Sequence, residues 1–374
     1  MKQVLIFKFP YSSLYGGGEK HTTLLVNELG KKGFVFHLVS SCPVLLQEFK
    51  KRKWSWKKTW AGKEPVSKGA LLIWPLVAPF VFVNLFRILL SYRIKKKVTV
   101  LYCQSLTEKI LATLPARMIG MKVIWIEHVT VERWLTKNPL RIFYRLFSRF
   151  VTIVVISRVI KEQLVQDIKI DKNKIEVVYN GIDLDVFVMK NRRWENTARF
   201  NIGCVARLEK EKGIEFLIQA IKIVREFIPF ARLIIVGEGS ERKKLQWLAE
   251  RLELKEAVQW VGHQEEIQKW YGYFDVYVLP SVTRESFGIT LVEAMASGLP
   301  VIASRIGGTP EVIDHNKDGL LAEPGNSQDI ADKLLYLFNN RSKTQEMVTT
   351  ARSKVEERFS LERMARDFYL LFRK

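Results

Sequence analysis

Short apolar runs alternate with helical patterns along nearly the whole chain, and this alternation restricts the possible folds more than any other feature. Strand patterns occur in the first half at 3–9, 34–40, 98–102, 122–127, 151–156 and 175–178. They resume in the second half at 200–206, 232–236, 258–261, 276–279 and 301–303, with helical patterns between them and from 326 onward. Strands that alternate with helices form parallel sheets covered by helices on both faces. The sequence therefore predicts an α/β fold with two tandem Rossmann-like domains.

A polar, irregular stretch separates the two alternating halves. It begins at Asn180 and runs to about Thr197, as expected of a linker between domains. With 374 residues, the chain is long enough for two domains that each bury their own core. We predict an N-terminal domain at 1–182, a C-terminal domain at 183–357 and a final helix at 358–374.

Two carboxylates frame the helix that begins in the segment 284–300. Glu285 precedes this apolar helix and Glu293 lies two turns inside it, so a fully helical path would separate them by about 12 Å. Four residues between them would present backbone N–H groups at a helix N-terminus: Ser286, Phe287, Gly288 and Ile289. Such amides bind phosphate well. The spacing suits a nucleotide sugar, with one carboxylate at the sugar, the amides at the diphosphate and the other carboxylate at the ribose. It exceeds the separation of the carboxylates in glycosidases.

Three further features lie where strands meet helices. Gly16 and Gly17 form a glycine-rich turn that lets backbone approach a phosphate, although an ordinary tight turn explains them about as well. Arg207 and Lys212 lie between a strand end and a helix start, which favours phosphate binding over ordinary surface charge. His128 stands at the carboxyl end of its strand, the edge where open parallel sheets bind ligands.

The formal net charge of +21 is concentrated in the first half, because residues 1–190 carry +19 and the remainder only +2. Six basic residues share the stretch 50–60 with three tryptophans that we expect at the surface, and a predicted helix at 140–150 carries a stripe of arginines. The apolar stretch 70–90 contains two prolines, so we predict a strand at 71–74 followed by an apolar helix rather than a membrane span. These features favour peripheral binding to an anionic membrane surface.

The basic and aromatic clusters also allow a rival interpretation, in which they bind nucleic acid by phosphate neutralisation and base stacking. No nucleic-acid-binding motif accompanies them, so we favour the membrane and predict no nucleic-acid partner. The three cysteines, Cys42, Cys103 and Cys204, are odd in number and far apart, which indicates buried thiols in a reducing compartment. We therefore predict a cytoplasmic protein that associates peripherally with the inner face of the membrane.

Glycine-rich and charged motifs follow one another in a fixed order along the chain. They are Gly16-Gly17-x-Glu19, Asn180-Gly181-Ile182-Asp183 with Phe187, Gly203 to Arg207 with Lys210 and Lys212-Gly213, Val236-Gly237-x-Gly239, Glu285-x7-Glu293, and Gly307-Gly308. With these motifs the chain resembles the retaining, two-domain GT-B glycosyltransferases of the group 1, family 4 kind. The resemblance covers nearly the whole chain and is strongest from about 199 to 325. It implies that the two domains face each other across a cleft and that the C-terminal helix packs back on the N-domain.

The resemblance also implies catalytic roles for individual residues. Glu285 would hold the hydroxyls of the donor sugar, and Glu293 would hold the ribose. Arg207 and Lys212 would bind the diphosphate and offset the charge that develops on the leaving group. His128 would face the donor sugar from the N-domain.

Other parts of the donor site are implied in the same way. Gly16 and Gly17 would let the N-domain backbone approach the diphosphate, and Gly262 lies in the segment that contacts the base. The donor would be a nucleotide-diphosphate sugar, most readily a UDP or GDP sugar, with no obligatory cofactor. The Asp183-x-Asp185 pair matches a metal-binding pattern but lies in the linker motif, so we interpret it as structural and predict no metal site.

We therefore predict an enzyme that transfers a sugar from a nucleotide-diphosphate donor to a lipid-linked or glycan acceptor at the membrane, with retention of the anomeric configuration. A nucleotide-sugar epimerase or a phosphorylase on the same fold is the alternative, because fold alone does not decide function.

Overall fold

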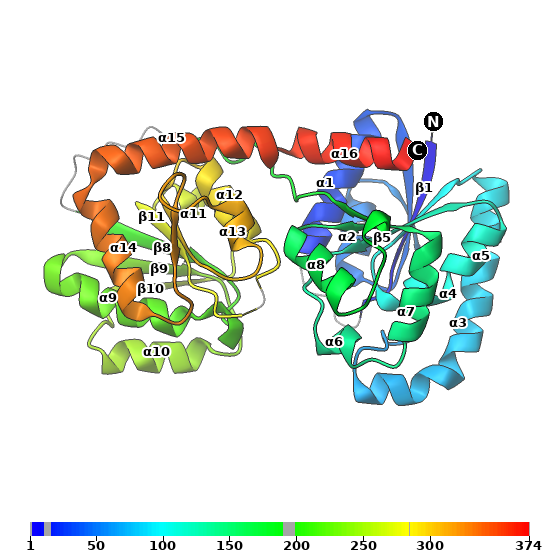
Figure 1. The fold of residues 1–374 in the computed structure, drawn as a ribbon, viewed down its shortest axis with the longest axis horizontal. Helices are drawn as coiled ribbons and strands as arrows, with labels where there is room; N and C mark the ends of the chain where they lie inside the picture. The colour runs from blue at the N-terminus through cyan, green and yellow to red at the C-terminus, as the bar shows by residue number, and fades with distance from the viewer. Residues whose placement is uncertain (1, 11–15, 190–198, 284, 374) are drawn as a thin grey trace. The chain divides into compact units, whose positions relative to one another are not determined.

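The computed structural model describes residues 2–10, 16–189, 199–283 and 285–373 and divides the chain into two compact units. Unit 1 comprises Met1–Tyr179 and Met364–Lys374, and unit 2 comprises Asn180–Arg363 (Figure 1). Residues 190–198 of the predicted linker lie outside the described residues. Each unit is built on its own parallel sheet. The predicted α/β class with two tandem Rossmann-like domains is confirmed.

Unit 1 contains a seven-stranded parallel sheet with the order β3-β2-β1-β4-β5-β6-β7. The strands are β1 Lys2–Lys8, β2 Phe34–Ser40, β3 Ser55–Lys58, β4 Val100–Cys103, β5 Lys122–Glu127, β6 Thr152–Val155 and β7 Ile175–Val177. The inner strands are runs of buried apolar residues, as expected where helices cover both faces of a sheet. The strand order reverses between β1 and β4, and such switch points are where open α/β sheets bind ligands.

Helices cover both faces of this sheet. They are α1 Gly17–Lys31, α2 Pro43–Lys51, α3 Lys68–Lys95, α4 Leu106–Leu111, α5 Thr113–Met118, α6 Arg133–Thr136, α7 Arg141–Phe147 and α8 Arg158–Gln166. Helix α3 lies against α4 and α5, and α4 lies against α7, so these helices share one layer (Figure 1). The last helix, α16 Leu361–Arg373, places the buried rings of Phe368 and Phe372 against Tyr102 on β4.

Unit 2 contains a six-stranded parallel sheet with the order β10-β9-β8-β11-β12-β13. The strands are β8 Phe200–Val205, β9 Ala231–Val236, β10 Val258–Gly262, β11 Val276–Leu279, β12 Val301–Ser304 and β13 Leu320–Ala322. The helices are α9 Ile214–Phe227, α10 Arg242–Arg251, α11 Ile267–Tyr271, α12 Ile289–Ala296, α13 Thr309–Val312, α14 Ser327–Asn339 and α15 Arg341–Arg358. A continuous apolar core joins α9 and α14 to the sheet.

The predicted strand at 71–74 is wrong, because these residues belong to the single helix α3. Ser67 begins the helix by accepting a hydrogen bond from the backbone N–H of Ala70 at 3.3 Å. Pro75 and Pro79 lie inside it, and each removes one backbone hydrogen bond. Both prolines are exposed, so their rings lie on the outer side of the helix rather than in the core.

The tryptophans of the basic stretch differ in exposure, so the expectation of three exposed tryptophans is wrong for one of them. Trp54 is half-buried because the chain turns back after α2 and sets its ring edge-on against Phe49, with ring centroids 5.1 Å apart. Trp56 and Trp60 are exposed. Residues 55–58 form β3, which pairs with β2 at the edge of the sheet. The three cysteines are buried and unpaired.

Candidate functional site

Parallel strands bring their carboxyl ends to one edge of each sheet, and the predicted site residues follow those ends. In unit 1, His128 comes directly after β5. In unit 2, Arg207 follows β8, Gly262 ends β10 and the segment containing Glu285 follows β11. Topology alone therefore gathers the predicted residues of each unit at the ligand-binding edge of its sheet.

Glu285 and Lys212 form a largely buried ion pair. Glu285 Oε2 accepts hydrogen bonds from Lys212 Nζ at 2.8 Å and from Ser281 Oγ at 2.9 Å. The side chains of Lys212 and Glu285 are only 16% and 10% exposed. Buried carboxylates and ammonium groups need partners because they have lost water. The pair therefore fixes both groups at the carboxyl end of β11.

The turn that carries Lys212 is held against β11 by a glycine. Gly213 has a φ of 60°, in the left-handed region, and a Cβ at this position would lie 2.2 Å from the carbonyl oxygen of Pro280. The backbone N–H of Val282 donates to the carbonyl of Glu211 at 3.0 Å. Only glycine allows this approach, which brings Lys212 within reach of Glu285.

A second glycine turn supports Glu285 from the other side. A Cβ on Gly307 would lie 1.9 Å from the carbonyl oxygen of Glu285, and a Cβ on Gly308 would lie 2.4 Å from that of Ser286. The N–H of Gly308 donates to the Glu285 carbonyl at 2.8 Å. The Gly307-Gly308 motif is thus a surface on which the backbone of the Glu285 segment rests.

Glu293 lies on α12 and is 1% exposed. Its Oε2 accepts a hydrogen bond from the hydroxyl of Tyr271 at 2.9 Å. Burial, followed by the charge of Glu293, raises the pKa of Tyr271 well above its ordinary value, so this hydroxyl stays a donor. Tyr277 donates to Thr290 Oγ1 at 2.7 Å and fixes the preceding turn of the helix.

At the amino end of α12, two of the four amides predicted to face a phosphate can be described as open. Gly288 precedes the helix with a φ of 86°, and no described residue accepts a hydrogen bond from the amides of Gly288 and Ile289. Phe287 is buried against Phe359, with ring centroids 5.5 Å apart. Ser286 is half-buried. Arg284, at the start of the predicted segment, lies outside the described residues.

Arg207 and Gly262 are more open to solvent than the Glu285 pair. The Arg207 side chain is exposed and pairs with Glu211 at 3.3 Å, an arrangement that holds a side chain only weakly. Gly262 has a φ of 83°, and its carbonyl accepts from the N–H of Gly237 at 2.9 Å. The structure therefore brings Glu285 to Lys212 but leaves Arg207 free to reorient toward a ligand.

In unit 1, Gly16 precedes α1 and Gly17 is its first residue. A Cβ on Gly17 would meet no atom within 4 Å, so this glycine leaves an open approach to the backbone. A Cβ on Gly18 would lie 3.3 Å from the ring of His128. Beneath the turn, Lys8 and Glu19 form a buried ion pair at 2.5 Å.

Among the described residues the His128 ring has no hydrogen-bond partner, although both of its nitrogens are buried. Its pKa lies well below the ordinary value, first because of burial and then because of the charges of His21, Lys8 and Lys109. The imidazole is therefore neutral at physiological pH. Nearly all buried polar groups have a partner in folded proteins. A neutral, unpartnered imidazole at a strand end is a group that a bound ligand could satisfy.

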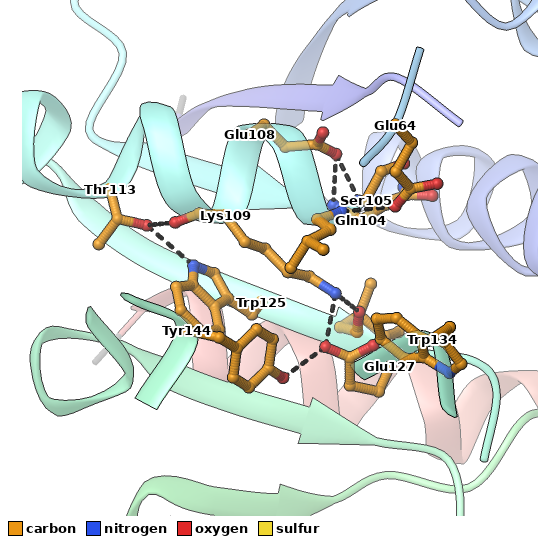
Figure 2. Close-up of polar contacts among 12 residues, drawn as sticks. Glu64, Gln104, Ser105, Glu108, Lys109, Thr113, Trp125, Glu127, Trp134 and Tyr144 are labelled. Carbon is orange, nitrogen blue, oxygen red and sulfur yellow. Dashed lines mark hydrogen bonds and ion pairs between the residues drawn. The ribbon is translucent and has the colours of Figure 1, made fainter. Parts of the chain in front are cut away.

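A buried hydrogen-bond network fixes the strand end that carries His128 (Figure 2). Glu127 Oε1 accepts from Lys109 Nζ at 2.6 Å and from the hydroxyl of Tyr144 at 2.6 Å. Lys109 Nζ also donates to the carbonyl of Ile126 at 2.8 Å. One α4 residue thus holds the last two residues of β5, directly before His128.

Local spacing did not reveal the residues that support the predicted site. Ser281, Tyr271, Lys8 and Lys109 each contact a site residue or its neighbour across a turn or between elements. Of these residues, Lys8 has the clearest signal in the sequence, because a cation in the last position of an apolar strand needs a partner. The other contacts exist only once the strands have been ordered in the sheet.

No cluster of three or more His, Cys, Asp or Glu residues that could hold a metal ion occurs within 2–10, 16–189, 199–283 and 285–373. Asp183 accepts a hydrogen bond from the backbone N–H of Asp185 at 3.0 Å. This is the local turn geometry that aspartate commonly forms.

Two protein-family models match consecutive parts of the chain. The model described as "Glycosyltransferase Family 4" matches residues 15–186, and the model described as "Glycosyl transferases group 1" matches residues 188–354. The boundary between the two matches falls in the polar stretch that follows Asn180.

Curated relatives match over part of their length. An uncharacterized glycosyltransferase of Methanocaldococcus jannaschii is 32% identical over 228 residues, which is 58% of each chain. A GDP-mannose-dependent alpha-(1-6)-phosphatidylinositol monomannoside mannosyltransferase of Mycobacterium tuberculosis is 29% identical over 206 residues, which is 51% of this chain and 54% of that protein. The chain thus spans a little more than half the length of these relatives.

Solved structures share the fold over the whole chain. HepE of Anabaena, crystallised in complex with UDP, superposes with a TM-score of 0.83 and covers 99% of both chains at 19% identity. At this level of identity the similarity shows a common two-domain GT-B architecture.

Proposed function

Because glycosyltransferase models match both halves of the chain, the chain belongs to the group 1 glycosyltransferases, and we propose that it transfers a sugar from a nucleotide-diphosphate donor to an acceptor at the membrane. The observation that carries the proposal is the buried pair of Glu285 and Lys212 at the carboxyl end of the unit 2 sheet. The pair places a carboxylate that can bind sugar hydroxyls directly beside an ammonium group that can bind a phosphate oxygen.

The diphosphate is the leaving group, so the site needs positive charge where the departing oxygen gains negative charge. Lys212 is held in place, whereas Arg207 is exposed and can swing from Glu211 to the donor. A guanidinium adds a two-pronged contact with phosphate oxygens. The amides of Gly288 and Ile289 add donors whose direction is fixed by the backbone. Together these groups would lower the energy of the departing diphosphate.

The remaining donor contacts follow the predicted roles. Glu293, oriented by Tyr271, would bind the ribose, and the backbone at Gly262 would contact the base. The open approach to Gly17 would admit the diphosphate from unit 1. His128, which is neutral and has no hydrogen-bond partner among the described residues, would hydrogen-bond the donor sugar.

We propose that transfer proceeds with retention at the anomeric carbon, as the family resemblance implies. None of the predicted site residues is nominated as a covalent nucleophile, so the route is substitution on the face from which the diphosphate leaves. The acceptor oxygen bonds to the anomeric carbon as the bond to the phosphate oxygen breaks. The acceptor proton passes to that departing oxygen, so the leaving group serves as the base.

We propose a lipid-linked or glycan acceptor at the inner face of the membrane. The support is the excess positive charge of residues 1–190 and the relative from Mycobacterium tuberculosis whose name specifies a phosphatidylinositol mannoside. The same name specifies GDP-mannose, which supports a nucleotide-sugar donor while leaving the choice between UDP and GDP to experiment.

The donor is tested first by thermal shift with UDP-, GDP- and ADP-sugars. We expect one base series to raise the melting temperature, since a ligand that binds the folded state stabilises it. Turnover of that donor is then compared in Glu285→Gln and Lys212→Met, each of which we expect to lower kcat/KM by about 100-fold or more.

The matched control is Lys222→Met, which breaks an exposed ion pair with Glu253 in the same unit. We expect it to leave kcat/KM unchanged. Near-normal turnover in Glu285→Gln or Lys212→Met would contradict the site, and no thermal response to any nucleotide sugar would contradict the function.

A further inference from the structure

Helix α3 has two apolar faces, and the described residues of the protein cover only one of them. One face packs into unit 1 through five buried side chains: Ala78, Val81, Leu85, Ile88 and Leu89. The opposite face is a stripe of exposed apolar side chains at steps of three, four and seven residues: Leu72, Leu76, Phe80, Val83, Leu90 and Ile94. A surface helix normally carries polar residues opposite its buried stripe.

The exposure of this second face is large. Leu72, Leu76 and Phe80 are 81%, 75% and 76% exposed, and Ile73 beside them is 57% exposed. Contiguous apolar surface of this kind marks a contact with another apolar phase or partner. The helix is long and apolar enough to cross a membrane, judged by length and composition alone. Its buried stripe, however, is already covered by protein, so only one side is available to lipid.

The tryptophan-rich basic stretch lies beside this helix. Asn84 on α3 donates a hydrogen bond to Thr59 Oγ1 at 3.0 Å. A Cβ on Gly62 would lie 3.0 Å from Val77 on α3 and 4.0 Å from the ring of Trp60. Trp60 is 63% exposed. Tryptophan is enriched at the level of lipid headgroups, where its ring can meet both apolar and polar surroundings.

The exposed charges on α3, directly after it and on the neighbouring β3 are positive. The helix contains no acidic residue. Exposed cations lie at its start, within it and after its end: Lys68, Arg87 and 95–97. On the neighbouring β3, Lys57 and Lys58 are exposed as well. An apolar stripe flanked by cations matches an anionic leaflet, whereas a second copy of this chain would bring like charges together.

We propose that α3 lies in the plane of the membrane surface, with the Leu72–Phe80 part of its exposed stripe among the lipid acyl chains and Trp60 at the level of the headgroups. This inference rests on the proposed function for the identity of the acceptor, and it names the surface through which unit 1 reaches that acceptor. It differs from attachment by charge alone, because apolar insertion resists high salt whereas contacts between exposed charges are screened.

Helix α7 extends the same layer, because α4 lies against both α3 and α7. Its exposed face combines Ile142, Phe143 and Leu146 with Arg141 and Arg145. Here apolar and cationic side chains are interspersed, as expected of residues that lie at the headgroups rather than below them. The predicted arginine stripe would then guide the orientation of α3 rather than supply the main attachment.

Vesicle flotation tests the proposal with the full chain. The protein is mixed with vesicles of phosphatidylcholine, alone or with phosphatidylglycerol, in low and in high salt. We expect binding to both vesicle types, tighter with phosphatidylglycerol, and retention in high salt. The variant Leu72→Gln/Leu76→Gln/Phe80→Gln should bind both vesicle types about 100-fold more weakly, because three apolar side chains no longer enter lipid.

The matched control is Phe227→Gln/Trp247→Gln, which changes two exposed apolar residues of unit 2 and should bind as the parent does. Thermal unfolding should be unchanged in both variants, since all the altered side chains are exposed. Release of the parent by high salt, or undiminished binding of the α3 variant, would overturn the proposal. Self-association without lipid that the α3 variant abolishes would assign the stripe to a second copy and would also overturn it.

Thiol labelling separates a helix in the membrane plane from one that crosses it. The three native cysteines are buried, so Lys68→Cys and Lys95→Cys introduce single exposed thiols at the two ends of α3. Each vesicle-bound variant is treated with a membrane-impermeant maleimide from outside. We expect both ends to react, and protection of one end would contradict the proposal. Neither assay needs a substrate, so failure here is distinct from failure of nucleotide-sugar binding.

Discussion

At the scale of single residues, His37 on β2 and His128 directly after β5 belong to the same unit yet differ in their partners. The His37 ring contacts Ser55 Oγ at 2.8 Å and Gln3 Oε1 at 2.9 Å. Within the part of the chain that the structure describes, the His128 ring has no hydrogen-bond partner, although its nitrogens are buried. An unsatisfied buried polar group costs stability. His128 therefore lowers the stability of the ligand-free protein, as expected of a residue whose role is to bind a ligand.

We expect His128→Leu to lower turnover strongly without lowering the melting temperature at pH 7.5. His37→Leu, the same change at a partnered ring, should lower the melting temperature by leaving Gln3 and Ser55 without a partner. Turnover and thermal unfolding of the two variants check this contrast. A melting temperature that falls equally in both variants would mean that His128 has partners in solution.

The lowered pKa of His128 adds a pH dependence with a definite sign. Above about pH 6.5 the ring is neutral in both the folded and the unfolded chain. In this range it therefore contributes no pH dependence to the free energy of unfolding. Below that pH the unfolded chain binds a proton that the folded chain does not, so the free energy of unfolding falls. We therefore expect His128→Leu to gain stability relative to the parent as the pH falls from 6.5 to 5.

The predicted site residues have clearer local sequence signals than the residues that support them. Glu285 and Lys212 are 73 residues apart, the family resemblance implies that they contact adjacent parts of one ligand, and their side chains lie 2.8 Å apart in the structure. Their positions followed from strand ends and glycine turns, which have local signatures. Tyr271 and Lys109 have no such signature, because their contacts depend on how neighbouring elements pack. The assigned roles in donor binding stay predictions until turnover is measured.

At the scale of elements, glycines decide how closely the turns of unit 2 approach its strands. Gly213 has a positive φ and lies against the carbonyl of Pro280, whereas Gly17 of unit 1 has open space around it. The two positions therefore predict opposite outcomes for the same substitution. Gly213 is needed by the fold itself, and Gly17 would be needed only when a ligand is present.

We expect Gly213→Ala to destabilise unit 2 by several kcal/mol, because the added Cβ and the left-handed backbone conformation both oppose it. Gly17→Ala should leave stability unchanged or slightly raised, since alanine suits the first turn of a helix. If the backbone at Gly17 approaches the diphosphate, the added methyl group should raise the KM of the Gly17→Ala variant for the donor. Denaturant unfolding and donor kinetics test the pair, and a destabilised Gly17→Ala would contradict the assignment.

Most elements could be predicted from period and length, and the exceptions have clear causes. Strands such as β1 and β8 are buried on both faces, so they appear as unbroken apolar runs bounded by turns. Helix α3 is also apolar on both faces, but one of its faces is exposed. Because both faces are apolar, the sequence shows no helical periodicity there. The two prolines then made a strand followed by a helix the natural interpretation. Exposure, which the sequence does not record, was needed to separate these cases.

At the scale of the whole molecule, the last described helix belongs to the same core as strands from the first part of the chain. Phe372 on α16 is fully buried, with its ring centroid 6.0 Å from that of Phe34 on β2 and 5.7 Å from that of Tyr102 on β4. Unit 1 therefore cannot complete its core until the rest of the chain, including unit 2, has been made. Unit 1 is therefore discontinuous in sequence, because unit 2 lies between its two segments.

We expect Phe372→Ala to destabilise unit 1 by about 3–5 kcal/mol, as is usual when a buried phenylalanine is truncated. Leu370→Ala, at an exposed position on the same helix, should change stability by less than about 0.5 kcal/mol. Hydrogen exchange of β1 and β8 measures the two units separately. In Phe372→Ala we expect β1 to lose protection and β8 to keep it. If β8 lost as much protection as β1, the two units would unfold together, which would contradict this prediction.

The orientation of α3 changes how often the protein meets its acceptor. A protein held at a leaflet no longer searches a volume, because it diffuses sideways over the same surface that carries the lipid. Its encounters then depend on the surface density of the acceptor, in the way that tethering raises the effective concentration of a partner. Diluting the acceptor with inert lipid should slow transfer, whereas adding more vesicles of the same composition should not quicken it once all the protein is bound. The nucleotide sugar, in contrast, still arrives from solution.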